Sequence, residues 1–283
     1  MRIAFLAGLL GVVLALFAPS LRGGLQNLLK ARRGLVWLAP MILTALFTAA
    51  SAIAGAFSFA LTGAVLIYTL LPVAAVWAGY DFAAILLLWL PIEFAAGAAL
   101  APVPARGFLH SAVYGVAILL GLVLFLGFRR LPGMKYNVPG SWRDVRLALA
   151  GFVVVAPLLV VMGMAIGFIP GPHWPVQPAG KMSAAVGIIF AGTALPEEIL
   201  FRALIQNMLM QRLGSTTRTL LLASVIFGAA HLDNGPQAVP NWRYMIEATI
   251  AGVAYGKVFQ KSSSVCSSAI LHMMVDWTKH FFF

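Results

Sequence analysis

Long runs of apolar residues separated by short polar segments form the dominant pattern of this chain. No charged residue occurs between Arg33 and Asp81, a stretch that accommodates two membrane-spanning helices of about 20 residues each. Because the runs are continuous and not alternating, they favour an all-α, polytopic bundle of transmembrane helices over a closed β-barrel. The pattern predicts about ten spans (eight to ten), at residues 3–18, 35–56, 59–79, 82–101, 108–128, 147–169, 182–208, 219–232, 244–259 and 264–280.

Proline and glycine concentrate at residues 131–140 and 170–180, where we expect loops. The first loop separates an amino-terminal transmembrane region, residues 1–146, from residues 147–283, and each region has about five predicted spans. In residues 20–33, leucines interleaved with Arg and Lys predict an interfacial amphipathic helix. The first apolar run can alternatively be read as a signal peptide, although no convincing cleavage site of small residues follows it.

Composition supports a multi-pass membrane protein, since 61% of the residues are hydrophobic and 10% are charged, against about 25% charged in soluble domains. The net charge of +11 lies mainly in short gaps between spans, so it indicates membrane topology and not nucleic-acid binding. With the amino terminus outside, most Lys and Arg residues lie inside, Arg202 falls within a span, and the outer group is Arg2, Arg106, Lys181, Arg243 and Lys279. A single cysteine, Cys266, excludes an internal disulfide.

Ionisable residues inside a span are costly to insert and usually face the interior of the bundle. The strongest group is Glu197, Glu198 and Arg202. Glu198 and Arg202 are four residues apart, a spacing that favours an ion pair on one helix face. Glu197 lies about 100° around the helix from Glu198, so it is free to point into a cavity and act as a general base.

Two later predicted spans contribute histidines. Phe227 precedes His231 by four residues, and His272 precedes Asp276 by four, which places each pair on one helix face. At about 1.5 Å of rise per residue, Glu197, His231 and His272 can meet in the inner half or near the middle of the membrane.

The remaining acids have simpler interpretations. We expect a structural or cavity-lining role for Glu93, and a solvated position near the outer interface for Glu247. Asp233 is expected in an outer loop.

The spaced motifs Glu197-Glu198-x-x-x-Arg202, Phe227-x-x-x-His231 and His272-x-x-x-Asp276 resemble those of the CPBP (CAAX protease and bacteriocin-processing, or Abi) family of intramembrane endopeptidases. This family includes the type II CAAX prenyl endopeptidases. The resemblance covers roughly residues 183–280 and implies a CPBP-like protease core within residues 147–283 of a protein in a prokaryotic cell membrane. It implies catalytic roles for Glu197 and His231 in activating water, and for His272 and Asp276 in stabilising the oxyanion, with Glu198, Arg202 and Phe227 in support.

The family often has Asn at the last motif position, where this chain has Asp276. An ionised Asp cannot donate a hydrogen bond to an oxyanion, so it is either protonated or orients His272 while the imidazole donates. Alternatively, Glu197, His231, His272 and Asp276 bind a zinc ion. No HExxH motif is present, and we favour the glutamate mechanism without a metal cofactor.

The sequence is therefore compatible with three functions of different classes. The favoured one is an endopeptidase that acts on a membrane-associated peptide or protein within the lipid bilayer, with no nucleic-acid partner. A second is a non-catalytic membrane immunity or assembly factor. A third is a transporter that uses Glu93, Glu197 and His272 as a proton relay, although the expected repeats are not visible in the sequence.

Overall fold

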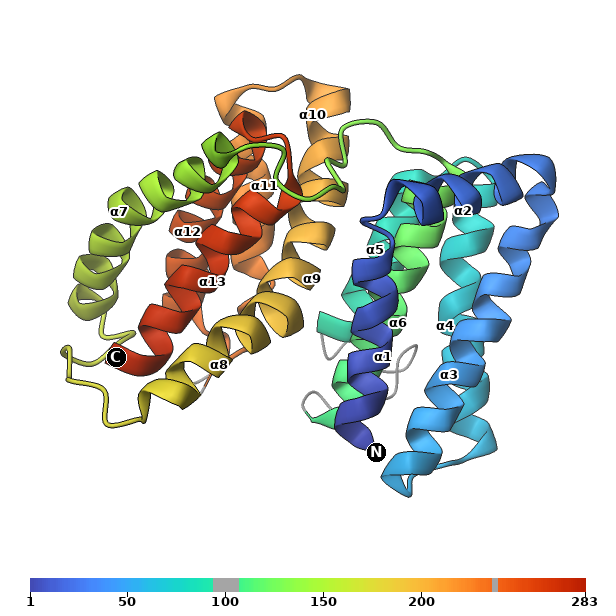
Figure 1. Cartoon of the computed structure of the whole chain (residues 1–283), viewed down its shortest axis with the longest axis horizontal. Coiled ribbons are helices and arrows are strands. Elements are labelled where there is room, and N and C mark those ends of the chain that lie inside the picture. The colour runs from blue at the N-terminus through green and yellow to red at the C-terminus, as the bar shows by residue number, and fades with distance from the viewer. Residues whose placement is uncertain (94–106, 236–238) are drawn as a thin grey trace. The chain divides into compact units, whose positions relative to one another are not determined.

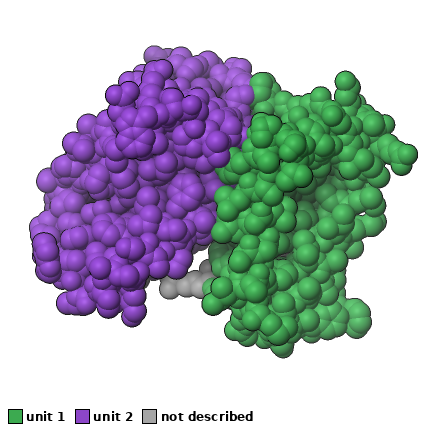
Figure 2. Space-filling view, viewed as in Figure 1, with its two compact units in different colours: residues 1–132 green, residues 133–283 purple. Residues whose placement is uncertain are grey.

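The computed structural model describes residues 1–93, 107–235 and 239–283, and these residues form helices and no strand. The chain divides into two compact units, residues 1–132 and residues 133–283 (Figure 2). The all-helical fold expected from the apolar pattern is thus confirmed. Part of the fourth predicted span, residues 94–101, and Arg106 lie outside the described residues.

The first unit is a bundle in which α3 packs against both α4 and α6, and α1 packs against α6. Arg129 donates to Asp81 over 2.7 Å and also binds the Val76 carbonyl, which ties the end of the bundle to the start of α5. The helices are α1 (Arg2–Ala15), α2 (Pro19–Ala31), η1 (Arg33–Trp37), α3 (Leu38–Ala54), α4 (Phe59–Trp77), α5 (Asp81–Glu93), α6 (Phe108–Gly121) and the π-helical η3 (Leu122–Phe128).

In the second unit, α13 packs against α7, α8, α9 and α12 (Figure 1). Side chains of Thr216, Asn241 and Ser264 accept hydrogen bonds from backbone N–H groups at the starts of α11, α12 and α13, as helix N-caps do. The helices are α7 (Trp142–Ala165), α8 (Ala179–Ile189), η4 (Phe190–Ala194), α9 (Leu195–Glu198), η5 (Ile199–Gln206), α10 (Asn207–Leu213), α11 (Thr217–Ala229), α12 (Trp242–Lys261) and α13 (Val265–Phe282).

Five helical stretches of the described chain are long and apolar enough to cross a membrane, and this agrees with an integral membrane protein. They are Arg33–Ala54, Phe59–Trp77, Phe108–Phe128, Trp142–Ala165 and Ala179–Leu213. A sixth candidate is formed if α1 and α2, which meet at an 84° bend, count as one broken span. The predicted number of about ten is not confirmed, because α1, α5 and α11 are short and α12 and α13 carry charged and polar residues.

The amino end of α7 is tied to the turn between α12 and α13. The buried Asp144 carboxylate accepts hydrogen bonds from the backbone N–H groups of Gly140 and Ser263 and from the Ser263 hydroxyl. Lys135, in the preceding loop, donates to the Phe259, Gln260 and Ser262 carbonyls at the end of α12. Burial lowers the pKa of the Lys135 ammonium below its ordinary value. These contacts fix the common end of the three helices that surround the site.

Helices α11 and α12 approach each other closely at Gly228. A Cβ atom on Gly228 would collide with Thr249 Oγ1 and lie 2.6 Å from the Met245 carbonyl oxygen. The Thr249 hydroxyl cannot swing away freely, because it donates to that same carbonyl over 2.7 Å. The small residues before His231 therefore permit a close helix contact, and this contact fixes the end of α11 from which His231 follows.

Replacing Gly228 with alanine should force α11 and α12 apart. Overpacking of this kind commonly costs about 1–3 kcal/mol, so the melting temperature of Gly228→Ala in detergent should fall by several degrees. Gly187→Ala is the matched control, because Gly187 is an exposed helical glycine with no atom within 4 Å of its added Cβ. Equal melting temperatures for Gly228→Ala and the wild type would contradict the close packing.

Candidate active site

A buried network of charged groups joins two of the sequence motifs. Glu198 accepts a hydrogen bond from Arg202 Nε at 3.1 Å through one carboxylate oxygen. Its other oxygen lies 3.2 Å from His272 Nδ1, which donates to it. The side chains of Glu198 and Arg202 are fully buried, and that of His272 is 4% exposed. The ion pair expected from the sequence is confirmed, and its contact with His272 is an addition to the expectation.

Aromatic rings enclose this network. The Arg202 guanidinium lies over the Phe227 ring, 4.6 Å from its centroid, so the face of the ring stabilises the cation. His272 stacks on Tyr255 with a centroid distance of 4.6 Å, and the Phe227 ring meets His272 edge to face. The Phe227 ring also contacts Phe201. These contacts leave the His272 ring little freedom to rotate.

The helix that carries Glu197 and Glu198 is not regular. Leu195–Glu198 is α-helical, but the segments before and after it, Phe190–Ala194 and Ile199–Gln206, are π-helical. Pro196 lies at the junction, where its ring would clash with the carbonyl of the preceding turn in a regular helix. Wide turns of this kind redirect the side chains that follow, and they occur frequently at functional sites.

Glu197 and Asp276 both face the second nitrogen of His272. His272 Nε2 lies 3.4 Å from Asp276 Oδ2 and 3.9 Å from Glu197 Oε2. Both distances exceed the roughly 2.7–2.9 Å of a strong charge-assisted hydrogen bond. Glu197 Oε2 is buried and has no hydrogen-bond partner among the described residues. This oxygen is therefore available to a water molecule or a substrate.

His231 lies in the turn directly after α11. Its Nδ1 is 2.9 Å from the Phe227 carbonyl oxygen, which can only accept, so Nδ1 carries the hydrogen and donates it. In the neutral ring, Nε2 then keeps its lone pair and can accept a hydrogen bond. In the described part of the chain, no hydrogen bond or ion pair joins His231 directly to Glu197.

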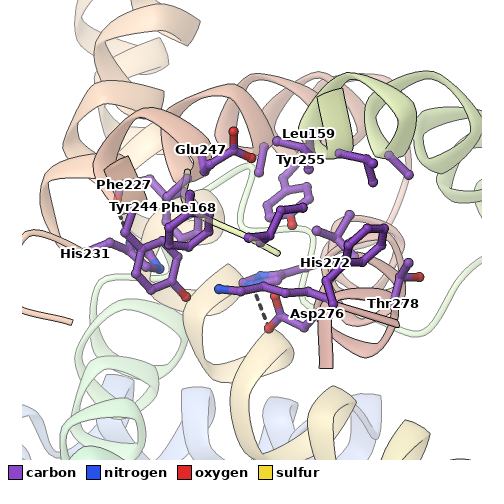
Figure 3. A pocket seen from close by; sticks show the side chains of 18 of the residues that line it. Leu159, Phe168, Phe227, His231, Tyr244, Glu247, Tyr255, His272, Asp276 and Thr278 are labelled. Atoms are coloured by element: carbon purple, nitrogen blue, oxygen red, sulfur yellow. Dashed lines mark hydrogen bonds and ion pairs between the residues drawn. The ribbon is translucent and has the colours of Figure 1, made fainter. Parts of the chain in front are cut away.

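A cavity of about 100 Å³ brings the four motif residues together (Figure 3). Glu197, His231, His272 and Asp276 line it, as does Phe227. The rest of its wall is mainly apolar and comes from α7, the loop after it, α12 and α13; it includes Leu159, Phe168, Ala248, Ala251, Tyr255 and Val275. Figure 3 shows His231, Tyr244, His272 and Asp276 around the same space.

One sequence expectation was wrong here. Glu247, placed near a solvated outer interface, is only 6% exposed and lines the cavity. The reason is that α12 packs against α7 along the face that carries Glu247, where Gly163 leaves room for the carboxyl group. Sequence reasoning also missed the cavity-lining residues Tyr244, Tyr255 and Lys279. An acid inside an apolar run was the available signal for Glu247. Asp233 is exposed in a turn, as expected.

The sequence also allowed Glu197, His231, His272 and Asp276 to be the ligands of a zinc ion. Among the residues that the structure describes, no group of three or more His, Cys, Asp or Glu side chains is arranged to hold a metal ion. Nδ1 of His272 donates to Glu198 and Nδ1 of His231 donates to the Phe227 carbonyl, and metal-binding histidines commonly make such bonds too, so these two contacts do not separate the mechanisms.

Comparison with known proteins agrees with the motif pattern. Residues 180–278 match the family model described as Type II CAAX prenyl endopeptidase Rce1-like. The matched range includes all three motifs, from Glu197 to Asp276. No curated protein and no solved structure matches the chain. The predicted resemblance is thereby confirmed: over residues 180–278, this membrane protein is similar to the type II CAAX prenyl endopeptidases.

Proposed function

We propose that this protein is an intramembrane endopeptidase that hydrolyses a peptide bond in a membrane-associated peptide or protein. The observation that carries the proposal is that Glu197, His231, His272 and Asp276 line one and the same cavity and all lie within the range that resembles an endopeptidase family. The catalytic part is assigned to residues 147–283, and residues 1–146 form its amino-terminal transmembrane region. The chemistry needs no prosthetic group.

In this proposal, Glu197 and His231 activate a water molecule. The unbonded Oε2 of Glu197 accepts one proton of the water, and Nε2 of His231 orients the water by accepting the other. The water oxygen then attacks the carbonyl carbon of the scissile bond and forms a tetrahedral intermediate. Glu197 passes its proton to the leaving nitrogen as the C–N bond breaks. A general base in this position commonly contributes a factor of about 10²–10⁴ in rate.

His272 is the group that we assign to the oxyanion. Its Nδ1–H is held by Glu198, so the ring presents Nε2 toward Asp276, Glu197 and the cavity. A hydrogen on Nε2 points in the ring plane, and its bond to Asp276 is weak at 3.4 Å, so it remains able to donate to negative charge that develops beside it. Asp276 would then orient and balance the charge of His272, without itself donating. With His272 as the donor, the oxyanion needs no hydrogen bond from Asp276, which an ionised carboxylate could not provide.

Glu197→Gln should abolish cleavage while the protein remains folded, because the amide cannot take a proton from water. His231→Ala should also reduce the rate strongly, and a loss of at least about 100-fold is expected for each. The assay uses full-length protein in liposomes and a quenched fluorescent peptide that ends in a prenylated cysteine and three further residues, tested beside its unprenylated form.

Asp233→Asn is the matched control, since this exposed acid lies two residues after His231. It should cleave at the wild-type rate. Full activity of Glu197→Gln, with confirmed absence of contaminating protease, would refute the assignment.

Incubation with a strong chelator such as 1,10-phenanthroline should leave the cleavage rate unchanged, because the four side chains carry out the reaction in the arrangement described. The comparison requires wild-type protein at one pH, with and without chelator. A loss of activity that added Zn²⁺ restores would instead support the zinc mechanism.

A further inference from the structure

A second acidic side chain lines the cavity and takes no part in the proposed chemistry. Glu247 on α12 is 6% exposed, and its Oε1 is buried with no hydrogen-bond partner among the described residues. Figure 3 shows it on the wall of the cavity away from Asp276. A buried carboxyl oxygen without a partner loses its hydration and gains no hydrogen bond in return, so its position in a cavity wall calls for a functional explanation.

Lys279, a cation of the cavity wall, does not occupy the unbonded oxygen of Glu247. Lys279 lines the same cavity, but its ammonium lies over two aromatic rings, 4.2 Å from the Phe168 centroid and 4.3 Å from the Tyr244 centroid. In the described ranges no hydrogen bond or ion pair within 4 Å joins Lys279 to Glu247, so the attraction between the two groups acts over a longer distance. The aromatic faces therefore hold the ammonium, and the Glu247 oxygen keeps its lone pairs.

A peptide that enters this cavity needs hydrogen-bond acceptors. Its backbone N–H groups leave water and must be satisfied inside the protein, since the hydrocarbon interior offers no partners. Most of the cavity wall is apolar, and carboxyl groups are the strongest hydrogen-bond acceptors among the side chains that line it. A basic side chain of the substrate is disfavoured beside Glu247 because Lys279 lines the same space.

We propose that Glu247 is a substrate-binding residue whose carboxyl group accepts a hydrogen bond from a backbone N–H of the peptide near the scissile bond. This inference rests on the proposed function and assigns to Glu247 a role in holding the peptide in register with Glu197. Water activation does not involve it.

The test measures binding separately from hydrolysis. Full-length Glu197→Gln protein in liposomes is titrated with the prenylated reporter peptide, and the Kd is compared with that of Glu197→Gln combined with Glu247→Leu. The leucine should raise the Kd about tenfold or more, as expected when one hydrogen bond is lost and the peptide N–H stays without a partner. Glu247→Gln keeps an acceptor oxygen and should bind within about threefold of the parent.

Thr278→Val, in the same background, is the matched control, because it removes a neutral polar group from the same cavity wall, whose hydrogen is bonded within its own helix. It should leave the Kd unchanged. Melting temperatures establish that each variant is folded. Reporter peptides methylated at one backbone nitrogen at a time should identify a position where methylation weakens binding to the parent but not to the Glu247→Leu protein.

An unchanged Kd for Glu247→Leu, or no methylation position with this dependence, would overturn the inference, as would failure of the parent to bind the reporter. Hydrolysis by protein with Glu197 intact is measured in parallel. Cleavage without a Glu247 effect on Kd refutes the binding role alone, whereas a Glu247 effect without cleavage supports the binding role and refutes the endopeptidase.

Discussion

Glu198 contacts Arg202 with one carboxylate oxygen and His272 with the other, and the geometry of the site depends on this buried arrangement. It connects two segments that are 74 positions apart in sequence, because His272 lies on α13. Removing one partner of such a buried pair leaves an uncompensated charge and typically costs about 3–5 kcal/mol. Such a network adds little to net stability, but it fixes the position of a histidine that would otherwise rotate.

Neighbouring acids consequently have different tasks. Both carboxylate oxygens of Glu198 have partners, whereas Glu197 keeps a buried oxygen that has no hydrogen bond to any residue the structure describes. Adjacent residues of a helix point about 100° apart, so Glu197 and Glu198 face different surroundings, and the π-helical turns on either side of α9 change the directions of the side chains around them. Phe227 contributes at the same point, since its ring contacts Arg202, His231 and His272. The protein thus separates the groups that hold the site from the groups that are free to react.

The sequence predicted the helical fold because apolar runs of this length have few other stable structures in a membrane. Spacing four residues apart predicted the pairing of Glu198 with Arg202 and the shared face of His272 and Asp276, and both are observed. These contacts follow from helix geometry alone. The number of spans was less predictable, because polar residues that line a cavity make α12 and α13 resemble helices of soluble proteins.

Contacts between helices could not be read from spacing. The bond from Glu198 to His272, the stacking of Tyr255 on His272 and the inward position of Glu247 each depend on how distant helices pack. The close approach of α11 and α12 at Gly228 was suggested by small residues, but the direction of packing was not. From the sequence, we expected Glu247 at the membrane interface. Its burial depends on α7, which packs against α12 and lies more than 80 positions earlier in the sequence.

The central claim is that this cavity hydrolyses a peptide bond with a water molecule activated at Glu197. Single-turnover cleavage of the reporter peptide in H₂¹⁸O, followed by mass spectrometry of the products and of the protein, tests it most directly. The account predicts one ¹⁸O atom in the newly formed carboxylate of the amino-terminal fragment and none in the Glu197 side chain. Absence of cleavage, or an ¹⁸O label that appears first in the Glu197 carboxylate, would contradict it.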